Sequence, residues 1–212
     1  MNIGVMASGR GSNFQSIIDS VESGFINARI VILITDNPGA YALERAEKHN
    51  ILSMVISPEN FPDRDSYYKH IADELEKRDV GLVVLAGFMR LVGKPLIDQF
   101  RGRIMNIHPA LLPSFPGLHG QKQATDYGAK ISGCTVHFVD EGVDTGPIII
   151  QAAVPAYSDD TEESLSERIL IQEHRIFPLA IRLFVDGRVK IEGRKVIVDA
   201  DRTETDLINP PL

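Results

Sequence analysis

Short apolar runs alternate along the chain with longer stretches in which apolar residues recur every three to four positions. Runs rich in Ile, Val and Leu are typical of strands covered on both faces, whereas the longer spacing predicts amphipathic helices. The expected strands span residues 3–7, 28–35, 53–56, 81–86, 132–139 and 148–155, with a further strand that starts at 104. The expected helices span 12–24, 41–49, 64–78, 95–100, a short stretch after 120, and 161–184.

This alternation of strands with helices predicts a parallel sheet. We therefore expect an α/β fold, a Rossmann-like and mostly parallel twisted sheet with helices on both faces. The chain contains no repeat, low-complexity segment or linker. We expect a single domain over residues 1–212, with an N-terminal lobe at about 1–100 and a C-terminal lobe at about 101–200.

Individual residues and short motifs predict four further local features. Ser12 and Gln15 have the spacing of a capping box at the start of the first helix. Pro178 predicts a bend in the last helix. Two short strands around Gly193 predict a hairpin, and the tail from Thr203 is expected to fray.

The loop at 8–13 contains Gly9 and Gly11 between the first strand and the first helix. These two match the start of a G-x-G-x-x-G dinucleotide fingerprint, but Phe14 takes the third position and is too large for close packing there. No Gly-Lys-Ser or Gly-Lys-Thr follows, which argues against a Walker A loop. A helix N-terminus with small glycines suits one phosphate monoester. A plain tight turn between strand and helix explains the same residues.

Two polar residues mark the strand that starts at 104. Asn106 and His108 are two positions apart, so their side chains point to the same face of a strand. Pro109 favours an extended conformation for His108 and restrains the pair. A buried strand with two hydrogen-bonded polar groups is the alternative interpretation. Asp144 lies in a glycine-flanked loop further along, where ordinary turn chemistry also explains it.

If Asp144 reaches His108, the pair acquires a chemical role. A nearby carboxylate raises the pKa of a histidine, and we expect it to make His108 largely cationic at neutral pH. A cationic imidazole beside the Asn106 amide offers two donors to one developing oxyanion, which suits attack on a carbonyl. The sequence has no Gly-x-Ser-x-Gly elbow and no reactive cysteine. Direct transfer between two bound substrates is therefore favoured over a covalent enzyme intermediate.

Composition narrows the class of protein. Hydrophobic residues make up 43% of the chain and charged residues 24%, which is typical of a soluble globular protein. The net charge of −7 argues against a dedicated nucleic-acid binder. Cys134 is the one cysteine and lies in an apolar run, so it predicts a buried small residue. With no apparent signal peptide or membrane span, a cytoplasmic protein is expected.

One stretch closely resembles the signature of the folate-dependent formyltransferases: Asn106-Ile107-His108-Pro109-Ala110-Leu111-Leu112-Pro113, followed by Phe115-Pro116-Gly117. Gly11-Ser12-Asn13 and the loop around Asp144 match the same family, and the resemblance extends to about Gly187. It implies the formyltransferase fold and transfer of a formyl group from 10-formyltetrahydrofolate, the co-substrate, to the amine of glycinamide ribonucleotide in purine synthesis. The first lobe would bind the nucleotide phosphate, and the second would bind folate and catalyse transfer.

The resemblance also assigns site residues, position by position. The catalytic positions would be Asn106, His108 and Asp144. The ribonucleotide-binding positions would be Gly11, Ser12, Asn13 and Glu173. The folate-binding positions would be Arg64, Met89, Arg90, Leu91, Val92, Asp140, Glu141, Gly142, Val143 and Asp144. Small-molecule substrates and a monomer or a homodimer are expected. The net charge, the hydropathy and the lack of histidine pairs at metal-ligand spacing predict no nucleic acid, membrane or metal.

Some positions stay open. Ser114 departs from the family, which often has Lys there, and Lys122 is a candidate to replace its charge. His119 and His137 could line the site or be structural. Arg90, without the resemblance, would be taken for a solvated surface charge.

Rival functions remain to be distinguished. A formyltransferase that acts on charged initiator tRNA shares the central signature, but the length and the negative charge argue against an added RNA-binding domain. A deformylase of the same folate usually carries a regulatory domain. A nicotinamide-dependent oxidoreductase would need the fingerprint that Phe14 interrupts. A non-catalytic nucleotide-binding module would explain the glycine loop but not the catalytic trio.

Overall fold

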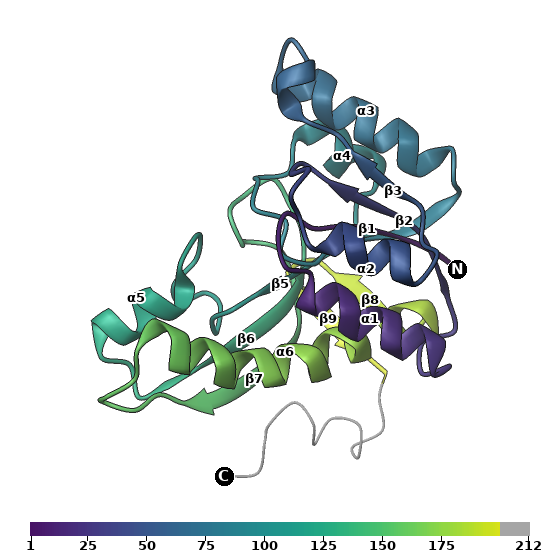
Figure 1. The fold of residues 1–212 in the computed structure, drawn as a ribbon. Helices are drawn as coiled ribbons and strands as arrows, with labels where there is room; N and C mark the ends of the chain where they lie inside the picture. The colour runs from purple at the N-terminus through teal and green to yellow at the C-terminus, as the bar shows by residue number, and fades with distance from the viewer. Residues whose placement is uncertain (200–212) are drawn as a thin grey trace. The chain divides into compact units, whose positions relative to one another are not determined.

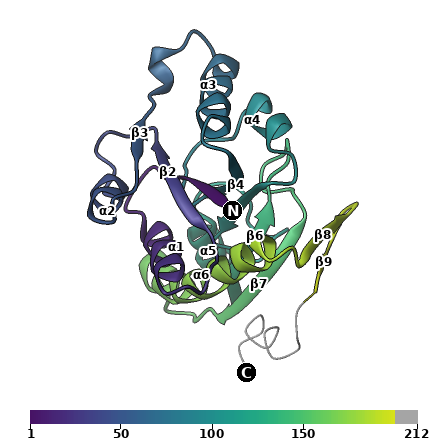
Figure 2. The ribbon, with the colours of Figure 1, turned by 90° about the vertical axis from the view of Figure 1, so that its right-hand side faces the viewer.

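The computed structural model describes residues 1–199 of the chain, and Figures 1 and 2 show its elements in two views. The strands are β1 (Asn2–Met6), β2 (Arg29–Thr35), β3 (Ser53–Val55), β4 (Val80–Leu85), β5 (Ile104–His108), β6 (Ile131–Phe138), β7 (Ile148–Pro155), β8 (Val189–Glu192) and β9 (Lys195–Val198). The helices are α1 (Ser12–Glu22), α2 (Ala42–Lys48), α3 (Arg64–Glu76), α4 (Lys94–Gln99), α5 (Gly120–Tyr127) and α6 (Glu162–Val185), with a 3-10 turn at Pro58–Asn60.

Seven strands form one sheet in the order β3-β2-β1-β4-β5-β6-β7, and β8 and β9 form a separate hairpin. Strands β1 to β5 pair in parallel, whereas β6 and β7 are antiparallel. The predicted α/β fold with a mostly parallel sheet is confirmed, as is the hairpin around Gly193.

The chain divides into two compact units. The first contains residues 1–106 and 139–141, and the second contains 107–138 and the chain from 142 onward. The prediction of one domain with lobes at about 1–100 and 101–200 stays a prediction.

The first unit is a doubly wound sheet. Crossovers between parallel strands are right-handed, and the strand order runs one way from β1 to β3 and the other way from β4 to β5. Helices α1 and α2 therefore cover one face, and α3 and α4 cover the other. The order reverses between β1 and β4, where the loops that leave the carboxyl ends of both strands diverge. Ligands of open α/β sheets bind at such a switch point.

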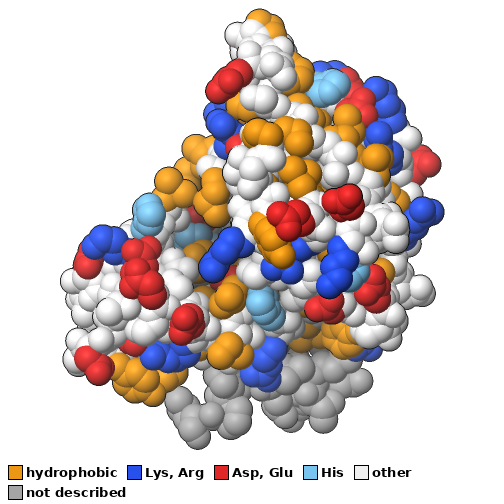
Figure 3. All heavy atoms as spheres, viewed as in Figure 1, with side chains coloured by type: hydrophobic (Ala, Val, Ile, Leu, Met, Phe, Trp, Pro, Cys, Tyr) orange, Lys and Arg blue, Asp and Glu red, His pale blue; other side chains and the backbone are white. Residues whose placement is uncertain are grey.

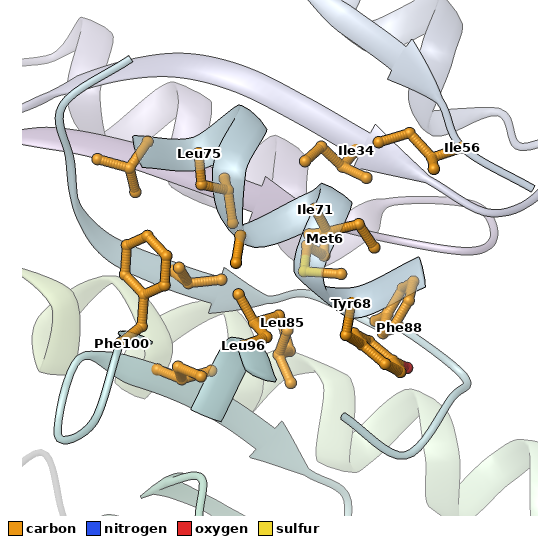
Figure 4. Close-up of a cluster of buried hydrophobic side chains, with 14 of the residues drawn as sticks. Met6, Ile34, Ile56, Tyr68, Ile71, Leu75, Leu85, Phe88, Leu96 and Phe100 are labelled. Carbon is orange, nitrogen blue, oxygen red and sulfur yellow. The ribbon is translucent and has the colours of Figure 1, made fainter. Parts of the chain in front are cut away.

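A hydrophobic cluster holds α3 and α4 against the sheet (Figure 4). Tyr68, Ile71 and Leu75 recur at helical spacing on one face of α3 and are buried. Leu85 at the end of β4 and Phe100 after α4 pack in the same cluster. Burying side chains of this size contributes roughly 1.5–3 kcal/mol each. This packing fixes the end of β4, from which the next loop departs.

The second unit is built on the β6–β7 pair. Helix α6 packs against both strands, and α5 packs against α6. Thr161 and Ser164 form a reciprocal capping box that starts α6. Pro178 is buried inside α6, and its predicted bend stays a prediction. Strand β9 of the hairpin, drawn in yellow in Figure 2, contacts β7.

The surface carries charges of both signs. Lys and Arg side chains lie among Asp and Glu side chains on the face drawn in Figure 3. Exposed pairs such as Lys94 with Asp98, 2.9 Å apart, contribute little stability. Within residues 1–199 no helix is long and apolar enough to cross a membrane. The predicted fraying from Thr203 lies outside the described residues.

Candidate active site

The segment after β5 is anchored by polar side chains of β6 and β7. The Leu112 N–H donates to the Thr135 hydroxyl at 3.0 Å, and that hydroxyl donates to the Ala110 carbonyl at 2.7 Å. The Gln151 amide donates to the Leu112 carbonyl at 2.9 Å. These bonds hold the proline-rich segment that follows His108, so the end of β5 is rigidly placed.

His108 lies between two oxygen acceptors. Its side chain is buried, at 4% exposure. Nδ1 is 3.3 Å from the Asp144 carboxylate, and Nε2 is 2.8 Å from the Phe115 carbonyl oxygen. A neutral imidazole has one N–H and can satisfy one of these acceptors, whereas an imidazolium satisfies both. The sequence left the distance between His108 and Asp144 open, and the structure brings them together.

Asp144 is held by more than His108. Its Oδ2 accepts a hydrogen bond from the Gly117 N–H at 2.8 Å, and its Oδ1 lies 3.6 Å from His137 Nε2. His137 Nδ1 faces the Phe138 carbonyl at 2.8 Å. Of the two histidines that the sequence left open, His137 therefore lies beside the carboxylate.

Burial has the largest effect on the pKa of His108. It lowers the pKa of His108 below the usual 6.5, although the Asp144 carboxylate and the Phe115 carbonyl act to raise it, and His137 lowers it further. The expectation that Asp144 makes His108 largely cationic is therefore wrong, because loss of hydration outweighs one carboxylate neighbour.

Asp144 shows the opposite balance. Burial alone raises the pKa of its carboxyl, but hydrogen bonds from His137 and the Gly117 N–H, together with the charge of His108, lower the pKa below its usual value. Asp144 is therefore an ionised carboxylate at neutral pH, and it favours the imidazolium form of His108 whenever that form is generated.

Asn106 stands on β5 two residues before His108. It pairs in register with Leu85 of β4 and is partly exposed. Strand geometry directs the Asn106 and His108 side chains to the same face.

The phosphate-loop candidate precedes α1. Gly11 is the N-cap of α1 in a left-handed conformation, at φ 67°, and no side chain caps the helix. The predicted capping box of Ser12 and Gln15 is therefore wrong: the helix starts one residue earlier than the box requires, and the Gln15 side chain binds Arg45 instead. Asn13 is buried, at 8% exposure, and Ser12 is partly exposed.

The loop after β4 contains the four folate-loop candidates. Met89 and Leu91 are exposed apolar residues, at 64% and 58%. Arg90 Nε is 2.6 Å from the Asp36 carboxylate, so Arg90 is an ion-pair partner and not simply a solvated charge. In the same loop, the Met89 N–H donates to the hydroxyl of Ser8, which lies in the loop after β1, at 3.0 Å.

Arg64 and Tyr68 hold this loop from α3. The Arg64 guanidinium donates to the carbonyls of Leu91 and Val92 at 2.8 and 3.1 Å, and the Tyr68 hydroxyl donates to the Leu91 carbonyl at 2.7 Å. Burial raises the pKa of Tyr68 to about 12, so its hydroxyl remains a donor. Arg64 therefore anchors the loop, whereas the resemblance implied a folate-binding position.

A pocket of about 540 Å³ opens between α3 and this loop. It is lined by Pro58, Phe61, Asp63, Arg64, Tyr67, Tyr68, Met89, Arg90 and Leu91. Aromatic and apolar walls beside two guanidinium groups suit an aromatic ligand that carries an anionic end.

The 140–144 segment has a different anchor in each unit. In the first unit, Glu141 lies 3.3 Å from Lys94 and 3.7 Å from Arg101, and Asp140 is partly exposed. In the second unit, Gly142 lies close to the Thr145 side chain: an added Cβ would come 2.0 Å from the Thr145 hydroxyl oxygen, so this side chain would have to move.

Arg194 of the C-terminal hairpin donates to the Thr145 carbonyl, next to Asp144. Residue patterns did not predict this contact, because Arg194 follows the stretch that resembles the family. Val143, one of the predicted folate-binding residues, is exposed, at 43%.

The remaining candidates occupy separate places. Glu173 is buried on α6, at 6% exposure. His119 Nδ1 is 3.3 Å from Glu162, and Lys122 is 2.6 Å from Asp126, so this lysine is engaged in an ion pair on α5. Cys134 is fully buried and burial raises the pKa of its thiol, as expected for an unreactive residue. Residues 1–199 contain no cluster of three or more His, Cys, Asp or Glu side chains that could bind a metal.

The chain was compared with known protein families, curated proteins and solved structures. The family model described as formyl transferase matches residues 1–181. The chain belongs to the formyl transferase family. It is 39% identical over 202 residues to the phosphoribosylglycinamide formyltransferase of Escherichia coli (strain K12), and the match covers 95% of each chain.

Two further relatives extend this comparison of the formyl transferase fold. The crystal structure of glycinamide ribonucleotide transformylase 1 from Symbiobacterium toebii superposes with a TM-score of 0.92 at 50% identity, covering 93% of each chain. The trifunctional purine biosynthetic protein adenosine-3 of Drosophila melanogaster is 49% identical over 191 residues. That match covers 89% of this chain but only 14% of the length of the trifunctional protein.

Several residues that shape the site were not predicted. Asp36 follows the end of β2, and Ser8 lies in the loop after β1. Both could have been predicted, because the carboxyl ends of parallel strands meet at one edge of the sheet. The Phe115 carbonyl and the Gly117 N–H are backbone groups, which carry no signature in side-chain identity. Tyr68 lies in the helix expected over 64–78, but its hydrogen bond to the loop after β4 was not predicted.

Proposed function

We propose that the protein transfers the formyl group of 10-formyltetrahydrofolate to the amine of N1-(5-phospho-D-ribosyl)glycinamide, a step of de novo purine synthesis. The observation that carries this proposal is the His108–Asp144 pair, 3.3 Å apart, at the end of the strand that presents Asn106. The identities to relatives named phosphoribosylglycinamide formyltransferase and glycinamide ribonucleotide transformylase support it.

The chemistry is an acyl transfer through a tetrahedral intermediate. The amine nitrogen forms a bond to the formyl carbon, and the carbonyl oxygen becomes an oxyanion. The bond from the formyl carbon to N10 of the folate then breaks, and the proton lost by the amine ends on N10. Asn106 and His108 donate hydrogen bonds to the oxyanion, and Asp144 assists the proton relay through water.

The cationic form of His108 carries one proton more than the neutral form; the ring takes this proton from solvent before the transfer and returns it when the products leave. Burial lowers the pKa of His108 below its usual value. Negative charge that develops on the neighbouring oxygen favours the cationic form, and the Asp144 carboxylate stabilises that cation. His108 Nε2 lies 2.8 Å from the Phe115 carbonyl oxygen, which can only accept a hydrogen bond. For Nε2 to serve the oxyanion, the formyl oxygen has to replace this carbonyl as its acceptor.

The other predicted positions divide between the two substrates. We propose that Gly11, Ser12 and Asn13 bind the ribonucleotide phosphate and that Glu173 contacts the same substrate. The pocket beside Arg64 and residues 89–92 is proposed for folate, together with residues 140–144. Cytoplasmic location, a single domain, the absence of a metal, and a monomeric or homodimeric state remain predictions from the sequence.

The competing functions are a folate hydrolase, a tRNA formyltransferase and a binding module. Incubation with 10-formyltetrahydrofolate, with and without glycinamide ribonucleotide, separates them. Turnover that requires the ribonucleotide is expected. Turnover in its absence would identify a hydrolase, turnover only with charged initiator tRNA would identify the tRNA enzyme, and no turnover would favour a binding module.

Replacement of the two donors tests the assigned roles. His108→Ala and Asn106→Ala are each expected to lower kcat by about a hundred- to a thousandfold, because the loss of one oxyanion donor costs roughly 2.7–4 kcal/mol. Thermal unfolding of each variant serves as the folding control. Near-normal turnover in either well-folded variant contradicts the role of that residue.

A further inference from the structure

The loop that precedes α1 is hydrogen-bonded along one side by the segment 37–45. The Ser8 carbonyl accepts from the Asn37 side-chain amide at 3.1 Å. The Gly9 carbonyl accepts from the Ala42 N–H at 3.1 Å, and the Arg10 carbonyl accepts from Arg45 Nε at 2.9 Å. Three successive carbonyl oxygens of one loop are thus engaged by one neighbouring segment, which we call the α2 clamp (residues 37–45).

The side chains of the clamp are themselves fixed. Asn37 Oδ1 accepts the Gly39 N–H at 2.9 Å, which orients the amide that reaches Ser8. Arg45 Nη1 donates to Gln15 of α1 at 2.9 Å, and its guanidinium lies 5.0 Å from the centre of the Tyr41 ring. Arg45 therefore bridges the loop and the first turn of α1 with two donors in fixed geometry.

Packing leaves the loop little room to move away from α2. A Cβ at Gly11 would lie 2.9 Å from the Ala42 Cβ, and Gly11 adopts a left-handed conformation that disfavours other residues. The contact between α1 and α2 is therefore close at this residue, and the hydrogen bonds of the clamp have a defined register.

The consequence concerns the orientation of the peptide groups. The first N–H groups of a helix have no acceptor within the helix, and together with the helix dipole they favour an anion. A carbonyl oxygen turned toward the same point would repel that anion. Because the clamp engages the carbonyls of Ser8, Gly9 and Arg10, these oxygens are kept away from the place where the N–H groups point.

We propose that Arg45, assisted by Asn37, is a positioning residue for the ribonucleotide phosphate: it orients the loop at 8–13 and does not itself contact the phosphate. The proposal rests on the function proposed above, which assigns the phosphate to Gly11, Ser12 and Asn13. Arg45 acts through the Arg10 carbonyl and Gln15, so its loss weakens binding of one substrate and leaves the chemical step intact.

Steady-state kinetics with both substrates test this role. Arg45→Met is expected to raise the KM for glycinamide ribonucleotide about tenfold, the equivalent of one charge-assisted hydrogen bond. The kcat and the KM for 10-formyltetrahydrofolate are expected to stay within about twofold, since neither depends on the clamp. Arg45→Lys keeps the charge but lacks the guanidinium that donates to both the Arg10 carbonyl and Gln15. A KM increase similar to that of Arg45→Met is therefore expected.

Arg29→Met, Asn37→Ala and Arg45→Lys distinguish a positioning role of Arg45 from other roles. Arg29→Met removes one exposed arginine from the opposite end of β2 and is expected to leave all constants unchanged. Asn37→Ala removes the Ser8 bond alone and is expected to raise the same KM by less. An unchanged KM in Arg45→Met, or equal rises for both substrates, would overturn the proposal. Full retention of affinity in Arg45→Lys would assign Arg45 a direct charge contact instead.

A binding measurement separates failure of this inference from failure of the proposed function. Inorganic phosphate is titrated into the 15N-labelled protein, and the amide shifts of Gly9, Gly11 and Ser12 are followed. Shift changes in the wild type that are lost in folded Arg45→Met support the clamp even if no formyl transfer is found. Equal shifts in both proteins overturn it, whatever the activity.

Discussion

At the scale of the residue, His108 shows two opposing effects on one side chain. Its ring nitrogens face a carboxylate and a carbonyl, an arrangement that suits the cation. Its burial nonetheless lowers the pKa, because the loss of hydration destabilises the imidazolium more than these two neighbours stabilise it. The sequence suggested Asp144 as a neighbour but neither the Phe115 carbonyl nor the lowered pKa, since burial is a property of the packed molecule.

Substitution of Asp144 tests this balance. Asp144→Asn removes the carboxylate that favours the imidazolium, so the pKa of His108 is expected to fall further below 6.5. The pKa is measured from the ring proton and nitrogen shifts of His108 in an NMR titration, with His108→Gln to assign the signal. A pKa that stays constant or rises in Asp144→Asn would show that the carboxylate does not govern the titration of His108.

At the scale of the element, the site depends on loops that other elements hold. The loop after β4 is held by Arg64 and Tyr68 of α3, and the loop before α1 is held by the α2 clamp. The turn that carries Asp144 is held by Arg194 of the β8–β9 hairpin, which lies beyond the residues that the family model matches. The loops supply the chemistry, and the helices and the hairpin supply their positions.

The hairpin contact yields a prediction of its own. Arg194→Met removes the donor to the Thr145 carbonyl and loosens the turn that carries Asp144, so kcat is expected to fall severalfold with smaller changes in both KM values. The nearby Lys195→Met removes the same charge from an exposed position and serves as the matched control. Equal kcat values for the two variants and the wild type would separate the hairpin from catalysis.

At the scale of the whole molecule, the stability of the fold is linked to the state of its site. His108 has a lower pKa in the folded protein than in the unfolded chain, so the unfolded chain binds a proton first as the pH falls. The stabilising contribution is complete above about pH 6.5 and is lost progressively as the pH falls through the folded pKa.

Urea unfolding at several pH values measures this linkage. Between about pH 7.5 and pH 5, the unfolding free energy of the wild type is expected to decrease more steeply than that of His108→Gln. His108→Gln lacks only the His108 ring, so the difference between the two curves reports the contribution of His108. Parallel curves would mean that His108 has the same pKa in the folded and unfolded states.

The sequence by itself determined the order of strands and helices, the parallel character of most of the sheet, and the family motif around His108. These follow from local periodicity and from residue identity, which need no long-range information. Even so, the capping box of Ser12 and Gln15 was wrong, because the N-cap is Gly11 and the Gln15 side chain binds Arg45, thirty positions away.

Only the tertiary structure decided which groups meet. The 3.3 Å separation of His108 and Asp144, the ion pair of Arg90 with Asp36 and the bond from Arg194 to Thr145 all join residues distant in the chain. The charge of His108 depends on how completely the packed chain excludes water from it. Burial and long-range hydrogen bonds arise only when the whole chain is folded, and residue spacing does not encode either one locally.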